Sequence, residues 1–125
     1  MPFQISVRRT FCAAHRLRLP GGATEPIHGH NWHVMVAVGR ETLDGYGFVM
    51  DFHELERIVD GIIGPWDNND LNAAEPFSGG TNPSAESVAD VIAARVTAAL
   101  PAEVMLTLVS VTEAEGCQAT FRPAA

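Results

Sequence analysis

The chain has 125 residues, of which 46% are hydrophobic and 18% charged, and this size and composition predict a single globular domain spanning residues 1–125. Eight arginines and no lysine stand against fifteen acidic residues, a balance that argues against the basic surface that nucleic-acid binding requires. No apolar run approaches the roughly 20 residues of a membrane span, and the N-terminus lacks a signal-peptide core. Two cysteines form no disulfide framework, so we expect a cytoplasmic protein that binds neither membrane nor nucleic acid.

The first 50 residues predict two long β-strands followed by a hairpin-like return. Hydrophobic residues alternate over residues 3–15 and again over residues 28–39, which is the period-two pattern of strands with one buried face. Asp44 and Gly45 are typical turn residues, and they predict a hairpin-like return through residues 48–50.

The middle of the chain predicts two helices separated by an irregular segment. Residues 52–63 carry apolar side chains at helical spacing, with Asp51 as the N-cap and Gly64-Pro65 as the stop. Residues 66–81 show no regular pattern, and unstructured segments of this length are often functional. A second helix is expected to open at Asn82-Pro83.

Two further strands are predicted at residues 104–113 and 117–122, after Pro101 ends the second helix. The resulting β-β-α-α-β-β order predicts an α+β fold in which two helices cover one face of a four-stranded antiparallel sheet. Such a sheet has two open edges, and we expect them to be paired by oligomerisation.

The strongest chemical signal is a set of three histidines. His28 and His30 are two residues apart on one strand and project to the same side. If the two N-terminal strands pair as a hairpin, His15 joins them from the neighbouring strand. Three imidazoles with an open fourth position are typical of a catalytic zinc site, although such histidines also occur as hydrogen-bonded structural residues.

The remaining histidines and the nearby cysteine are not expected to bind the metal. His33 has the wrong parity relative to His30, and His53 falls in the first turn of an exposed helix. Cys12 points to the face opposite His15, and we expect it to be a small buried residue.

Several motifs together resemble one family, that of 6-pyruvoyl-tetrahydropterin synthase and 6-carboxytetrahydropterin synthase. They occur in the family's order and cover nearly the whole chain: F-x-A-A-H-x-L at residues 11–17, H-G-H-N followed by an aromatic residue at 28–32, G-x-V-x-D-F-x-x-L at 47–55, N-P-S-x-E (N-P-T-x-E in the family) at 82–86 and V-x-E at 111–113.

The resemblance implies a T-fold in which strands of three subunits close a barrel and two trimers form a homohexamer. It implies active sites between subunits, with zinc held by His15, His28 and His30 and with a pterin such as 7,8-dihydroneopterin triphosphate as substrate. Glu113 matches the glutamate that anchors the pterin ring, and a carboxylate that accepts two parallel N–H bonds recognises such an edge selectively.

Two catalytic positions of the family are changed in this chain. Thr24 stands where the family has a cysteine, and Asn68 replaces the histidine of an Asp-His dyad whose aspartate is kept as Asp67. Neither a threonine hydroxyl nor an asparagine amide exchanges protons near neutral pH, and each positioned acid–base group contributes roughly 10²–10⁴-fold. The standard synthase reactions are therefore not expected.

Three functions remain open at this point. Glu25, beside the changed cysteine position, and Asp67 could catalyse an altered reaction, with Glu25 as the base of a lyase that cleaves the side chain to 6-hydroxymethyl-dihydropterin. The chain could instead bind a pterin or a purine without catalysis, or serve as an oligomeric scaffold. Zinc occupancy depends on hydrogen bonds that support the imidazoles, which the sequence does not specify.

Overall fold

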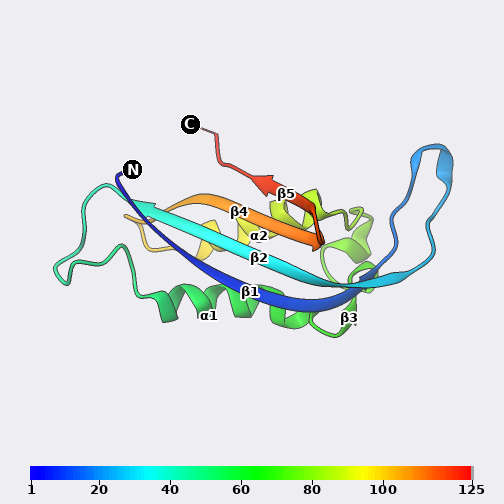
Figure 1. The fold of residues 1–125 in the computed structure, drawn as a ribbon, viewed down its shortest axis with the longest axis horizontal. Coiled ribbons are helices and arrows are strands. Elements are labelled where there is room, and N and C mark those ends of the chain that lie inside the picture. Colours follow the sequence, from blue (N-terminus) through cyan, green and yellow to red (C-terminus); the bar gives the residue numbers. More distant parts are fainter. Residues whose placement is uncertain (125) are drawn as a thin grey trace.

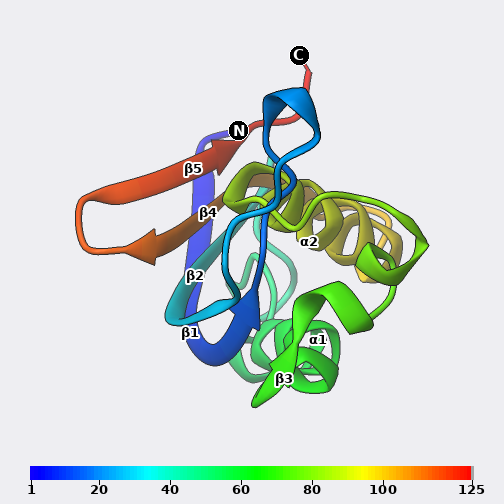
Figure 2. The same cartoon turned by 90° about the vertical axis from the view of Figure 1, so that its right-hand side faces the viewer.

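The computed structural model describes residues 1–124 and contains a curved sheet with two α-helices packed on one of its faces (Figures 1 and 2). The helices are α1 (Phe52–Ile63) and α2 (Ala85–Ala99). The strands are β1 (Phe3–His15), β2 (His28–Arg40), β3 (Asn69–Asp70), β4 (Met105–Ala114) and β5 (Cys117–Phe121). Four single-turn 3-10 helices lie at Pro20–Gly22, Gly64–Trp66, Leu71–Ala73 and Phe77–Gly79.

The sheet has five strands in the order β3-β1-β2-β4-β5, so the prediction of four antiparallel strands is wrong in detail. The four long strands pair antiparallel as expected. The fifth is the two-residue β3, which pairs parallel to β1 at Ala13 and Ala14. It comes from the segment that showed no regular pattern, because a two-residue strand is too short to leave a period in the sequence.

The core lies between the sheet and the two helices. The predicted inward residues of β1 and β2 supply much of it, including Phe11 and Trp32, whose parallel rings lie 5.7 Å apart. The α1 helix packs against β1, and α2 packs against β4 and β5. Alternation along the strands therefore selected the correct buried face.

The hairpin-like return expected at residues 48–50 forms no strand, although Val49 and Met50 are buried in the core. Both sides of β2 are already occupied by β1 and β4, so no position in the sheet is open beside it. The Asp44 carboxylate instead accepts hydrogen bonds from the backbone N–H groups of Tyr46 and Phe48 at 2.8 and 3.0 Å, and the chain turns directly towards α1.

The helix starts depend on side-chain caps. The Asp51 carboxylate accepts a bond from the His53 N–H, as predicted. The second helix starts two residues later than expected, because Ser84 is its cap and Pro83 lies outside it. This shift frees the Pro83 carbonyl, which bonds a histidine of the site described next.

Candidate metal and pterin site

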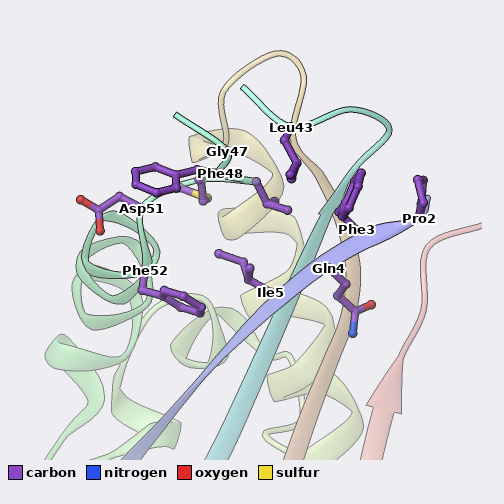
Figure 3. A pocket seen from close by; sticks show the side chains of 11 residues that line it. Pro2, Phe3, Gln4, Ile5, Leu43, Gly47, Phe48, Asp51 and Phe52 are labelled. Atoms are coloured by element: carbon purple, nitrogen blue, oxygen red, sulfur yellow. The ribbon is translucent and has the colours of Figure 1, made fainter. Parts of the chain in front are cut away.

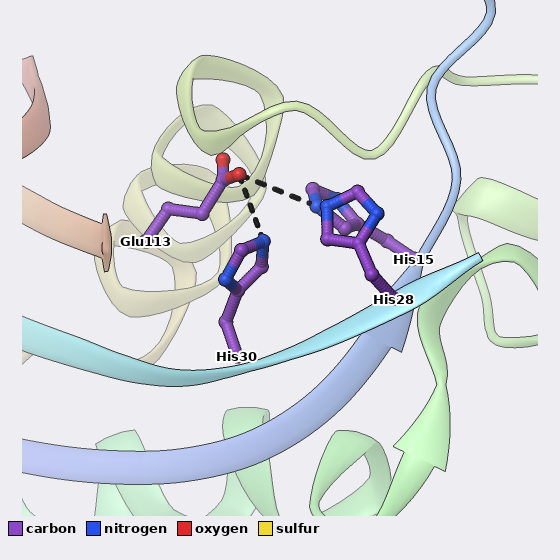
Figure 4. Close-up of side chains that lie close together, drawn as sticks. All are labelled: His15, His28, His30 and Glu113. Atoms are coloured by element: carbon purple, nitrogen blue, oxygen red, sulfur yellow. Dashed lines mark ion pairs between the residues drawn. The ribbon is translucent and has the colours of Figure 1, made fainter. Parts of the chain in front are cut away.

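The hairpin of β1 and β2 brings the three predicted histidines together. His15 lies directly opposite His28 in the antiparallel register, and His30 follows two residues later on the same face. The imidazole ring centres lie 4.7–5.1 Å apart. Glu113, near the end of β4, completes a group of four side chains whose nearest ligand atoms all lie within 4.8 Å of one another (Figure 4).

One oxygen of Glu113 faces two of the rings. Its Oε1 lies 3.0 Å from His30 Nε2 and 3.4 Å from His15 Nε2. Both nitrogens are buried, and neither makes a directed hydrogen bond with any described atom. Unsatisfied buried polar atoms are rare, so the pair requires an explanation.

Hydrogen bonds to backbone carbonyls orient two of the rings. His15 Nδ1 lies 2.7 Å from the Pro83 oxygen, and His28 Nδ1 lies 2.9 Å from the Pro26 oxygen. A carbonyl only accepts, so each Nδ1 carries the proton, and in a neutral ring Nε2 then carries a lone pair. The supporting contacts that the sequence left unspecified are therefore present for His15 and His28.

This tautomer makes the residues fit a metal ion. In His15 a nitrogen lone pair is directed towards a carboxylate oxygen, and two such acceptors repel unless a cation or a proton lies between them. Burial lowers the pKa of His30, an effect only partly opposed by the Glu113 carboxylate, which disfavours a proton at that ring. Three imidazoles, two of them oriented through Nδ1, are suited to zinc.

Glu25 lies at the edge of this group. Its Oε1 is 3.7 Å from His28 Nε2 and accepts a hydrogen bond from the Leu17 N–H at 3.0 Å. The side chain is 24% exposed, so it is partly enclosed and still open to a substrate. The neighbouring Thr24 is exposed.

Asp67 and Asn68 are not part of the group in this chain. The Asp67 carboxylate accepts a bond from the Cys12 N–H at 2.9 Å, and the Asn68 N–H donates to the Cys12 carbonyl at 2.6 Å. Both residues are thereby fixed along the outer edge of β1. The sequence placed Asp67 among the catalytic candidates, and the structure does not bring it to the histidines of its own chain.

The other predictions for this region have mixed outcomes. His33 is directed away from the group and contacts the Thr10 hydroxyl at 3.0 Å, and His53 is exposed on α1, both as expected. The expectation that Cys12 is buried is wrong. Its side chain lies on the sheet face that the helices leave uncovered, because Cys12 has the parity opposite to His15.

A hollow lies next to the group. It is lined by residues from β2, from the end of β4 and from the turn that follows, including His30, Asn31 and Glu113. A separate apolar hollow of about 500 Å³ lies at the start of β1, lined by Phe3, Ile5, Leu43, Phe48 and Phe52 among others (Figure 3). It lies at the opposite end of β1 from His15, and it is not part of this site.

A mixed sheet of this strand order, with two helices packed on one face, is an α+β architecture of the T-fold class. The model of the family described as 6-pyruvoyl tetrahydropterin synthase matches residues 4–124. The chain belongs to this family.

Curated relatives carry different names within the family. The chain is 34% identical over 113 residues to the dihydroneopterin monophosphate aldolase of Pyrococcus furiosus, an alignment that covers 90% of this chain and 91% of that protein. It is 30% identical over 115 residues to the human 6-pyruvoyl tetrahydrobiopterin synthase, covering 82% and 79% of the two chains. The family is shared by enzymes with more than one named activity.

Solved structures show the same fold. The 6-pyruvoyl tetrahydropterin synthase of Caenorhabditis elegans superposes with a TM-score of 0.84 at 20% identity, over 98% of this chain and 96% of that one. A Plasmodium vivax 6-pyruvoyltetrahydropterin synthase, solved as a variant in which a catalytic glutamate is replaced by alanine, superposes with a TM-score of 0.79 at 17% identity, over 98% of each chain.

Proposed function

We propose that this protein is a zinc-type lyase that cleaves the side chain of a dihydroneopterin-like substrate to give 6-hydroxymethyl-dihydropterin. The observation that carries the proposal is the placement of Glu25, whose carboxylate lies beside His28 and is held there by the Leu17 N–H. The name of the Pyrococcus furiosus relative, an aldolase, supports the same chemistry.

The proposed step breaks the bond between the first and second carbons of the side chain. Glu25 accepts the proton of the second carbon's hydroxyl group, that carbon becomes an aldehyde, and the bonding electron pair passes to the first carbon and the conjugated pterin ring. Protonation of the first carbon completes the reaction, so atoms and electrons balance and no oxidant is needed. Glu25 would donate this proton as well, acting as base and then as acid.

His15, His28 and His30 would hold the zinc ion. When bound, zinc supplies a Lewis acid that stabilises negative charge developing on oxygen. Glu113 would accept hydrogen bonds from the N–H edge of the pterin in the neighbouring hollow, which orients the side chain towards Glu25. Any ring with a similar N–H edge, such as a purine, could donate hydrogen bonds to the same Glu113 carboxylate.

The standard synthase reactions are not part of the proposal. Thr24 has no acid–base capacity near neutral pH and is exposed, and Asn68 is bound to the backbone of Cys12. We propose that Asp67, which lies outside the histidine group of its own chain, acts in the site of a neighbouring subunit.

A non-catalytic pterin-binding or purine-binding protein is the second candidate. It is favoured by the engagement of the Asp67 carboxylate, which accepts a hydrogen bond from the Cys12 N–H and lies outside the histidine group of its own chain. A protein of this kind would bind a pterin at Glu113 and release it unchanged.

Incubation of the zinc-loaded protein with dihydroneopterin and with its mono- and triphosphates, followed by mass spectrometry, tests the proposal. We expect 6-hydroxymethyl-dihydropterin and the matching hydroxyaldehyde. Glu25→Gln should lower turnover by about 10²–10⁴-fold because the amide cannot accept the hydroxyl proton. Glu41→Gln, a change of the same kind at an exposed position beyond β2, is the matched control.

The alternatives give different results in the same experiment. Tight pterin binding without any product would favour the binding protein. Formation of 6-pyruvoyl- or 6-carboxytetrahydropterin would contradict the proposal, and unchanged turnover in Glu25→Gln would exclude Glu25 as the base.

A further inference from the structure

The segment that follows β1 continues as an extended chain, which pairs on one edge with residues 24 and 25 and has no described strand on its other edge. It leaves the sheet after His15 and forms the start of the long loop that returns to β2 at His28 (Figure 1). Two asparagine side chains take the place of a neighbouring strand. Both belong to the stretch between α1 and α2, far away in sequence.

Each asparagine makes a reciprocal pair of hydrogen bonds with one residue of this segment. The Arg16 N–H donates to Asn72 Oδ1 at 2.8 Å, and Asn72 Nδ2 donates to the Arg16 carbonyl at 3.0 Å. The Arg18 N–H donates to Asn82 Oδ1 at 2.9 Å, and Asn82 Nδ2 donates to the Arg18 carbonyl at 3.1 Å. A primary amide offers the same donor and acceptor as a peptide group, which is why it can pair with a backbone in this way.

The residue between them faces the opposite edge and holds Glu25. In an extended chain the N–H and C=O groups of alternate residues point to opposite edges, so Arg16 and Arg18 share one edge and Leu17 presents the other. The Leu17 N–H donates to Glu25 Oε1 at 3.0 Å, and the Glu25 N–H donates to the Leu17 carbonyl at 3.0 Å. The position of the Glu25 carboxylate therefore depends on a backbone that the asparagines fix on its other side.

We infer that Asn72 and Asn82 are positioning residues for Glu25. This inference rests on the proposed function, in which Glu25 exchanges protons with the substrate. A misplacement of a catalytic group by about 1 Å can lower the rate roughly 10²-fold. Loss of the four side-chain hydrogen bonds that fix this backbone should therefore lower turnover. The Glu113 carboxylate, on β4, lies outside this network, and pterin affinity should not depend on it.

The test combines steady-state kinetics with amide hydrogen exchange on the zinc-loaded protein. In Asn82→Ala we expect the Arg18 amide and also the Leu17 amide to exchange at least tenfold faster. With dihydroneopterin monophosphate as substrate, kcat should fall at least tenfold while KM stays within twofold. Asn72→Ala should act in the same way through Arg16, and it provides a second, independent variant if one of them does not fold.

Two further variants separate positioning from general stability. Asn82→Asp keeps an acceptor for the Arg18 N–H but replaces the donor to the Arg18 carbonyl, so it should resemble Asn82→Ala. Gln4→Glu makes the same change of amide to acid at the other end of β1, where Gln4 Oε1 accepts a bond from the Thr107 hydroxyl. This control should leave kcat and the Leu17 amide unchanged.

Faster exchange at Arg18 with unchanged exchange at Leu17 and unchanged kcat would overturn the inference. So would a kcat loss that Gln4→Glu reproduces. If the native protein turns over no pterin, the proposed function fails. The exchange rate of the Leu17 amide, compared between the native protein, the asparagine variants and Glu25→Gln, still decides whether the asparagines fix the backbone that holds the Glu25 carboxylate.

Discussion

The position of Glu113 fits two roles, that of a metal ligand and that of a pterin-binding residue. One of its oxygens faces His15 and His30, as a fourth metal ligand would, and a hollow lies beside it. In the proposed function it binds the pterin. The two roles differ in what is lost when the carboxylate is removed.

For Glu113→Gln we expect zinc content to remain near one ion per chain, because three histidine ligands are retained. Pterin affinity should fall at least tenfold, since an amide presents one acceptor in place of two. Metal analysis and titration of pterin fluorescence measure the two quantities. Loss of zinc with retained pterin binding would instead make Glu113 a metal ligand.

At the scale of elements, the candidate site lies at one end of the β1–β2 hairpin, where His15 is paired with His28. The two helices pack on the same sheet, and they differ in how they contribute to this end. The start of α2 contributes directly, because its cap at Ser84 leaves the Pro83 carbonyl free to orient His15. The start of α1 has no such link to the site.

We therefore expect Asp51→Ala to lower stability without changing the site. The Asp51 carboxylate caps α1 through the His53 N–H, and loss of such a cap costs about 1 kcal/mol of unfolding free energy. Urea denaturation measures this loss, with Asp90→Ala on the exposed side of α2 as a control. An unchanged midpoint in Asp51→Ala, or an altered zinc content, would contradict the expectation.

At the scale of the whole molecule, the sheet has open edges within residues 1–124. The short β3 covers β1 only at Ala13 and Ala14, and the outer edge of β5 has no partner strand. Unpaired edges of this length are normally covered. The expected homohexamer, with strand edges joined around a barrel, is our proposal for how they are covered here. No helix of the described chain is long and apolar enough to cross a membrane.

Light scattering on the purified protein tests the assembly. We expect a mass six times that of the 13.4 kDa chain, with trimers as the intermediate when the hexamer is diluted. Because Asp67 is placed away from the histidines of its own chain, turnover should fall as the assembly dissociates. A fully active monomer would contradict both the assembly and the proposed role of Asp67. A cytoplasmic location remains an expectation from the sequence.

Local patterns were sufficient for most of the architecture. Alternating residues in β1 and β2 identify the buried face and the side to which His15, His28 and His30 project, because side chains on a strand alternate strictly. The α1 helix and its Asp51 cap follow from helical spacing within a dozen residues. These features depend on neighbours in sequence, which is why they could be predicted.

Contacts between distant segments were decided only by the folded chain. The β3 strand, the partner carbonyl of His15 and the asparagine pairs at Arg16 and Arg18 each join residues more than 50 positions apart. The position of Asp67 outside the histidine group was likewise decided only by the folded chain. Backbone N–H and C=O groups are the same at almost every residue, so the sequence does not indicate which of them a side chain will contact. Their partners depend on the segments that the packed core brings side by side.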